Sequence, residues 1–125
     1  MSEQVKLSDW DIDLRYGQQG EIYVNNLLAS PIETVECKRD RRWRETGNLF
    51  IETHCYSSQV GTWYESGISI TKATHWAFIL DDNVLIFLTS KIKTLLGPLG
   101  HQVSMTRDDY STKGYLLPIM KLVNA

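Results

Sequence analysis

Apolar and polar residues alternate along the stretch Thr34–Cys55, which reads TVECKRDRRWRETGNLFIETHC. Val35 and Cys37 are separated by charged residues in its first part, and Leu49 and Ile51 alternate with more polar positions in its last part. A period of two is typical of half-buried strands. The pattern therefore predicts two strands joined by a charged loop.

Pairing these strands as a hairpin centred near Arg44 would place Glu36 directly opposite Glu52. Like charges opposite each other destabilise a ladder unless something neutralises them. A divalent cation such as Mg²⁺ would do so, because hard cations bind carboxylate oxygens. Lys38 would share a face with Glu36, and His54 would share a face with Glu52. This face is either simply solvated or a metal site with two acids, a lysine and an imidazole.

A change of period predicts the first helix, from about residue 17 to residue 29, where apolar residues recur at helical spacing. On this helix Glu21 lies about 20° from Leu28 around the axis, so it flanks the apolar stripe. Most glutamates in such a position are exposed to solvent. Glu21 is therefore either one more exposed glutamate or a residue that reaches the edge of whatever surface the helix covers.

The strongest apolar runs are His75–Leu80 and Val84–Leu88, and the polar turn between them predicts a buried hairpin that supplies the core. A helix is expected next, capped by Thr89 or Ser90 and ended by the Gly97–Pro98 pair.

The remaining segments have weaker patterns, each with one expectation. Residues 9–14 alternate as an edge strand or an extended lead-in would, residues 56–67 extend the sheet and then leave it as a loop, and residues 71–74 form a short helix. After residue 99 we expect a polar loop and then a short apolar C-terminal element that starts near Pro118.

The length of 125 residues and the hydrophobic content of 42% predict one compact domain over residues 1–125, with its core at about 15–97. With 13 basic and 15 acidic residues the net charge is −2, which excludes a uniformly basic nucleic-acid coat. Any contact with nucleic acid must then come from a local patch. The dense basic run contains Lys38, Arg39, Arg41, Arg42 and Arg44.

Cys37 and Cys55 fall on the apolar side of the two predicted strands, where we expect reduced, buried thiols. No apolar run is long enough to span a membrane, and the N-terminus lacks a signal-peptide pattern. We therefore expect a soluble cytoplasmic protein, in the host cell if a phage encodes it.

A helix with an acid at its edge, a strand with an acid and a lysine, and a second acid-bearing strand together resemble the PD-(D/E)xK nuclease superfamily. The strings VECKRDRRWRETGNLFIE and SGISITKATHWAFIL are similar to a group of small phage-borne or environmental members, over roughly residues 15–90. The resemblance implies a restriction-endonuclease-like α/β domain, with a central mixed β-sheet flanked by helices. It also implies a metal-dependent deoxyribonuclease. Many members act as dimers, so a homodimer is a further expectation.

The superfamily motif can be laid on the sequence in two ways. In the first, Glu36 and Lys38 form the acid-x-lysine half, and Glu33 is the sole candidate for the preceding acid, on the opposite face. In the second, Glu36 is the first acid, and Glu52 and His54 form the other half, with histidine where lysine is usual. We favour the second layout, in which Lys38 or His54 does the work of the missing lysine.

The resemblance also implies roles for these residues. Glu36 and Glu52 would hold Mg²⁺ or Mn²⁺, with Glu21 bound directly or through water, while Lys38 stabilises negative charge. The residues expected to hold the nucleic-acid backbone are Arg39, Arg41, Arg42 and Arg44.

Two alternatives to an active nuclease stay open. One is a nucleic-acid-binding or phage-assembly protein that keeps the nuclease-like fold without its chemistry. The other is a subunit whose site is completed by another chain. DNA and RNA substrates, and endonuclease and exonuclease action, are not separated by the sequence.

Overall fold

The computed structural model describes residues 15, 18–30, 33–106 and 109–125. Its contacts divide the chain into two compact units, Met1–Thr34 and Val35–Ala125, and each is described by itself. In the first unit, residues 18–29 form a helix, as the helical spacing predicts, and Glu21 on this helix is exposed. The alternating segment at residues 9–14 lies outside the described residues. One domain over the full length stays a prediction.

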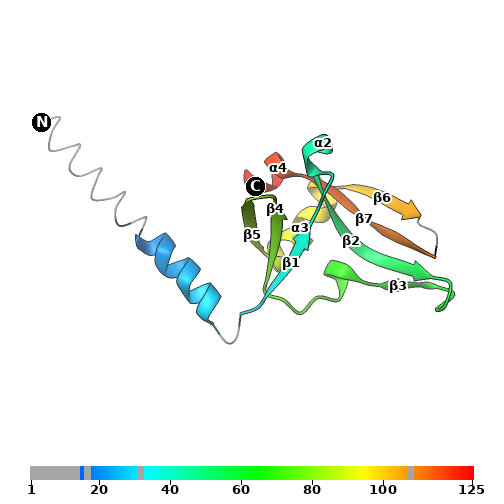
Figure 1. The fold of residues 1–125 in the computed structure, drawn as a ribbon, viewed down its shortest axis with the longest axis horizontal. Coiled ribbons are helices and arrows are strands. Elements are labelled where there is room, and N and C mark those ends of the chain that lie inside the picture. The colour runs from blue at the N-terminus through cyan, green and yellow to red at the C-terminus, as the bar shows by residue number, and fades with distance from the viewer. Residues whose placement is uncertain (1–14, 16–17, 31–32, 107–108) are drawn as a thin grey trace, which may run out of the picture. The chain divides into compact units, whose positions relative to one another are not determined.

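The second unit is a mixed α/β structure with two sheets and few helices (Figure 1). One sheet has the strand order β1 (Val35–Arg39), β4 (His75–Leu80), β5 (Asn83–Leu88). The other has the order β3 (Trp63–Glu65), β2 (Asn48–Ser57), β7 (Tyr110–Pro118), β6 (His101–Thr106). The helical elements are α2 (Trp43–Thr46), the 3₁₀ turn η1 (Gly67–Ser69), α3 (Thr89–Leu99) and α4 (Ile119–Val123). The α/β class is thus confirmed, but two sheets stand where one central mixed sheet was expected.

The predicted hairpin between β1 and β2 is wrong, because the two strands belong to different sheets. β1 pairs with β4 in parallel, which places Glu36 opposite Trp76, whereas β2 pairs with β7 and places Glu52 opposite Gly114. The physical reason is the apolar strand β4, which is buried along nearly its whole length and therefore needs a neighbour on each edge. β1 supplies one neighbour and β5 supplies the other.

The core lies where apolar side chains of both sheets meet α3 and α4. Trp76 and Phe78 of β4 are almost fully buried, and their stacked rings lie 6.4 Å apart between centroids. Leu49 and Ile51 of β2 join them, as does Ile92 of α3. The predicted hairpin of β4 and β5 is confirmed as an antiparallel pair, and β4 supplies one side of this core. The expectation that both strands are buried is wrong for β5, because Val84, Ile86 and Leu88 are exposed.

Four other expectations need correction. Residues 71–74 form no helix, and the helical turn lies earlier, in η1. α3 continues through Gly97 and Pro98 to Leu99, and the residue before it is Leu88 rather than a capping Thr89 or Ser90. The expected polar loop after residue 99 is largely the antiparallel pair β6 and β7. Cys37 is exposed rather than buried.

Two further expectations are met. Both cysteines are free thiols, and the apolar C-terminal element is α4. Within the described ranges, no helix combines the length and the apolar character needed to cross a membrane.

Candidate functional site

A pocket of about 510 Å³ brings together three of the residues singled out from the sequence, Glu36, Lys38 and Glu52. Glu36 and Lys38 project to the same side of β1 because side chains two residues apart share a face of a strand. Glu52 comes from β2, in the other sheet. The three residues therefore meet where the two sheets adjoin, and not across one ladder.

The carboxylate of Glu36 has an ion-pair partner, but one of its oxygens lacks a hydrogen bond among the described residues. Its Oε2 atom lies 3.9 Å from Lys38 Nζ, which is an ion-pair distance but too long for a hydrogen bond. The same oxygen is buried and has no hydrogen-bond partner among the described residues. A buried acceptor without a partner is costly, so this oxygen has capacity for a cation or a donor.

Lys38 is held at the pocket by more than this ion pair. Its Nζ atom also lies 5.6 Å from the centroid of the Trp76 ring, within the range of a cation–π contact. The side chain keeps 46% of its surface exposed. Lys38 therefore offers a positive charge that a ligand in the pocket can reach.

One wall of the pocket is formed by Gly67 and residues 70–73, and it packs closely on the backbone of β2 at Gly67. Gly67 has φ +56°, and a Cβ atom there would overlap the carbonyl oxygen of Glu52. Only glycine combines this left-handed conformation with such an approach. The amide of Ser66 donates to the carbonyl of Thr53 over 2.9 Å, and Ile68 is 1% exposed and anchors the turn in the core. The segment is thus fixed beside Glu52.

This wall adds Thr71 and Lys72 to the pocket, residues that sequence reasoning did not single out. The amide of Thr71 donates to the Gly67 carbonyl over 3.1 Å, and the Thr71 hydroxyl accepts from the amide of Ala73 over 3.2 Å. Lys72 is exposed and brings a second ammonium group. Its segment has no regular structure, so no periodic pattern could mark it.

His54 does not join the pocket. The register of β2 on β7 shifts at Thr53, so Glu52 lies opposite Gly114 and His54 lies opposite the next residue, Lys113. Neighbouring rungs point to opposite sides of a sheet. The expectation that Glu52 and His54 share a face is therefore wrong, and the cause is this bulge. His54 lines a separate hollow instead.

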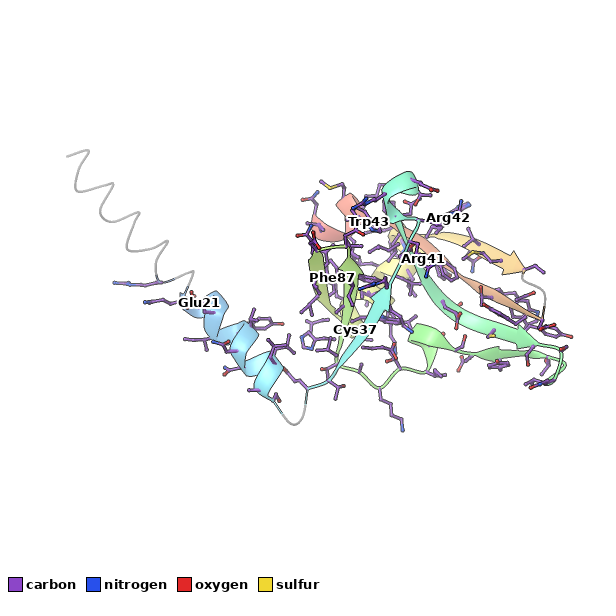
Figure 2. The ribbon with its side chains drawn as sticks, in the orientation of Figure 1. Glu21, Cys37, Arg41, Arg42, Trp43 and Phe87 are labelled. Atoms are coloured by element: carbon purple, nitrogen blue, oxygen red, sulfur yellow. The ribbon has the colours of Figure 1, made fainter. Side chains whose placement is uncertain are left out.

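The charged loop is organised by Asp40. Its carboxylate accepts hydrogen bonds from the amides of Arg42 over 2.8 Å and Phe50 over 3.1 Å, which ties the end of β1 to β2. Arg41, Arg42 and Trp43 lie together where β1 passes into α2 (Figure 2).

The arginines of this loop differ in their ion pairs. Arg42 lies 3.9 Å from the Glu45 carboxylate, and Arg44 pairs with Asp81. Arg39 and Arg41 are exposed and make no ion pair within the described part of the chain. None of the four lines the pocket of Glu36 and Glu52.

A divalent metal is compatible with two carboxylates of the pocket. Glu36 has an oxygen without a partner, and Glu52 lines the same space. No cluster of three or more His, Cys, Asp or Glu residues occurs among the described residues. Glu21 belongs to the first unit, whereas all residues that line the pocket belong to the second. Mg²⁺ commonly binds through one or two protein carboxylates and keeps several waters, which matches this donor set.

Tyr64 lies on the same side of the four-stranded sheet as Glu52. The hydrogen bond with Cys55 is the main cause that raises the pKa of the Tyr64 phenol above its ordinary value, and the charge of Glu52 raises it further. Cys55 and Tyr64 also lie directly opposite each other on β2 and β3. The side of the sheet opposite His54 therefore carries Glu52, Cys55 and Tyr64.

Comparison of the chain with protein-family models, curated proteins and solved structures finds no match.

Proposed function

We propose that this protein is a Mg²⁺- or Mn²⁺-dependent nuclease of the PD-(D/E)xK, restriction-endonuclease-like type that hydrolyses phosphodiester bonds in DNA. One observation carries the proposal: Glu36, Lys38 and Glu52 line one pocket, and a buried oxygen of Glu36 there has no hydrogen-bond partner among the described residues. Two carboxylates and a lysine supply what phosphodiester hydrolysis needs, namely metal ligands and a positive charge.

In this proposal Glu36 and Glu52 hold the metal. A bound divalent ion lowers the pKa of a coordinated water and polarises the phosphate. Lys38, beside Glu36, stabilises the negative charge that develops on the phosphate oxygens as water attacks phosphorus and the bond to the leaving oxygen breaks. Lys72, from the pocket wall that follows η1, orients the phosphate.

The geometry favours Lys38 over His54 as the group that replaces the lysine of the motif. Lys38 lines the same pocket as both carboxylates, whereas His54 lines a hollow on the opposite side of the sheet. A catalytic group has to lie within hydrogen-bond reach of the reacting atoms. We therefore assign Lys38 to the site and leave His54 out of it.

Arg39 and Arg41 are the loop residues best suited to the DNA backbone. Both are exposed, and neither is engaged in an ion pair within the described residues. Contacts of this kind position nucleic acid without reading its sequence. Arg42 and Arg44 already have carboxylate partners, so they contribute less.

A second candidate is a nucleic-acid-binding protein that keeps the pocket without catalysis. It is favoured by the finding that the described residues gather two carboxylates at the pocket and no larger metal-binding group. Its acids would bind no metal, or bind one without coupling to DNA.

Calorimetric titration with MnCl₂ tests the metal site directly. We expect wild type to bind Mn²⁺, and Glu36→Gln and Glu52→Gln each to weaken binding at least about tenfold, the lower end for a lost ligand or its support. Glu65→Gln is the matched control, since Glu65 lies on the same sheet but opposite His54, away from the pocket. Equal Mn²⁺ affinity in wild type and Glu52→Gln would contradict the proposal.

A further inference from the structure

The four-stranded sheet has a second hollow, of about 560 Å³, on the side that faces away from the Glu52 side chain. It is lined in part by His54 of β2, Gln102 and Ser104 of β6, and Lys113 and Tyr115 of β7. These residues share one side because His54, Ser104 and Lys113 lie on one rung, and Gln102 and Tyr115 lie opposite each other. We call this surface the sheet hollow.

Two aromatic rings continue the same face beyond the sheet hollow. Tyr56 and Trp63 lie directly opposite each other on β2 and β3, and Tyr56 is two residues from His54, so all three point to one side. The two ring centroids are 5.7 Å apart and the rings are tilted by 50°. Trp63 is 38% exposed, which is high for so large an apolar ring.

Lys113 joins the hollow to these rings. Its Nζ atom lies 4.0 Å from the centroid of the Trp63 ring, a close cation–π contact. Contacts of this type at an exposed site are weak, so the ammonium group can leave the ring when a better partner arrives. The ring face and the positive charge are therefore available together.

The charges of the sheet hollow differ from those of the pocket of Glu36 and Glu52. Its lining includes Lys113 and His54 and contains no carboxylate among the described residues. Glu65, opposite His54 on the edge strand, is the carboxylate next to it in the ladder. Gln102 Nε2 donates to the Tyr115 hydroxyl over 3.0 Å and keeps one further N–H. Such a surface suits an anion that also carries flat rings.

We propose that the sheet hollow and the Tyr56–Trp63 pair bind single-stranded nucleic acid. A nucleobase stacks on Trp63 in the place of the Lys113 ammonium, which moves to a backbone phosphate. Stacking on exposed aromatic rings combined with basic groups is how sheets bind single strands without sequence preference. A duplex hides the faces of its bases inside the stack, so it cannot use Trp63 in this way. The choice of nucleic acid as ligand rests on the proposed nuclease function.

Fluorescence anisotropy of a labelled oligothymidylate of roughly a dozen nucleotides tests this surface, because that length is within the site sizes of small sheet domains. The titration is done in EDTA, so that cleavage plays no part. We expect Trp63→Ala to weaken binding by roughly five- to a hundredfold, the range for loss of one stacked base. Tyr64→Ala is the matched control, because Tyr64 is adjacent, 40% exposed and on the other side of the sheet.

Two further variants keep the test decisive if Trp63→Ala fails to fold. Trp63→Phe retains a ring and should retain most of the affinity. Lys113→Gln should reduce the slope of log affinity against log salt by about 0.7, the value for one phosphate contact with a single strand. Equal affinities for Trp63→Ala and Tyr64→Ala, or an unchanged salt slope in Lys113→Gln, would overturn the inference. Because this binding is measured in EDTA, where no metal-dependent cleavage takes place, failure of this surface is separable from failure of the nuclease.

Discussion

Glu52 and His54 lie two residues apart on β2 and face opposite sides of the four-stranded sheet. In a regular strand they would share a side, and the extra residue at Thr53 separates them. Glu52 consequently lines the pocket of Glu36 and Lys38, while His54 lines the sheet hollow. One bulge thus divides the polar residues of β2 between two surfaces.

The first prediction compares the two basic groups at these surfaces. Lys38→Ala should lower the rate of metal-dependent DNA cleavage by about 10²-fold or more, the usual effect of losing one group that stabilises transition-state charge. His54→Ala should leave the rate within a few fold of wild type, because His54 does not line the pocket of Glu36 and Glu52. Single-turnover cleavage rates measure both variants. The reverse order of effects would return the role to His54.

The second prediction concerns the loop arginines. Arg39→Ala and Arg41→Ala should each reduce the slope of log affinity for duplex DNA against log salt by about 0.9, the value for one phosphate contact. Arg42→Ala and Arg44→Ala serve as controls of equal charge change, and we expect smaller effects because both residues have carboxylate partners. Filter binding over a range of salt concentrations measures the slopes. Four equal slopes would show that these ion pairs do not matter for binding.

The third prediction tests how the pocket wall is seated. Gly61 and Gly67 both have positive φ, but a Cβ at Gly61 meets nothing, whereas one at Gly67 would overlap the Glu52 backbone. Gly61→Ala should cost about 1–2 kcal/mol of unfolding free energy from the left-handed conformation alone. Gly67→Ala should cost clearly more and also weaken Mn²⁺ binding. Urea unfolding of the two variants measures the difference, and equal midpoints would mean that the segment can shift away from β2.

The sequence predicts the strands of this fold better than their partners. The alternation around Val35 and Ile51 and the apolar run from His75 to Leu80 each mark a strand that the structure contains. The pairing of β1 depends on β4, a buried strand that follows about forty residues later in the chain. A local pattern carries no information about such a distant choice. The strand β6 is missed because Val103 and Met105 are its only apolar members. Its partner β7 is missed with it.

The positions of the candidate-site residues, too, are predicted correctly where local spacing determines them and missed where it does not. Glu36 and Lys38 share a face because of their spacing alone, and this holds whichever strand lies beside β1. The position of His54 depends on a bulge at Thr53, and Thr is compatible with a regular strand, so no residue type indicates the bulge. Lys72 reaches the pocket through an irregular segment, which periodicity cannot detect.

The most direct test of the nuclease is cleavage of end-labelled single-stranded, duplex and four-way-junction DNA, in Mg²⁺, Mn²⁺ or EDTA. Wild type is compared with Glu52→Ala, and circular dichroism confirms that the variant is folded. We expect metal-dependent cleavage of at least one substrate by wild type and none by Glu52→Ala. Equal cleavage by both proteins would remove Glu52 from the site, and no cleavage by wild type on any substrate would contradict the nuclease and favour the binding protein.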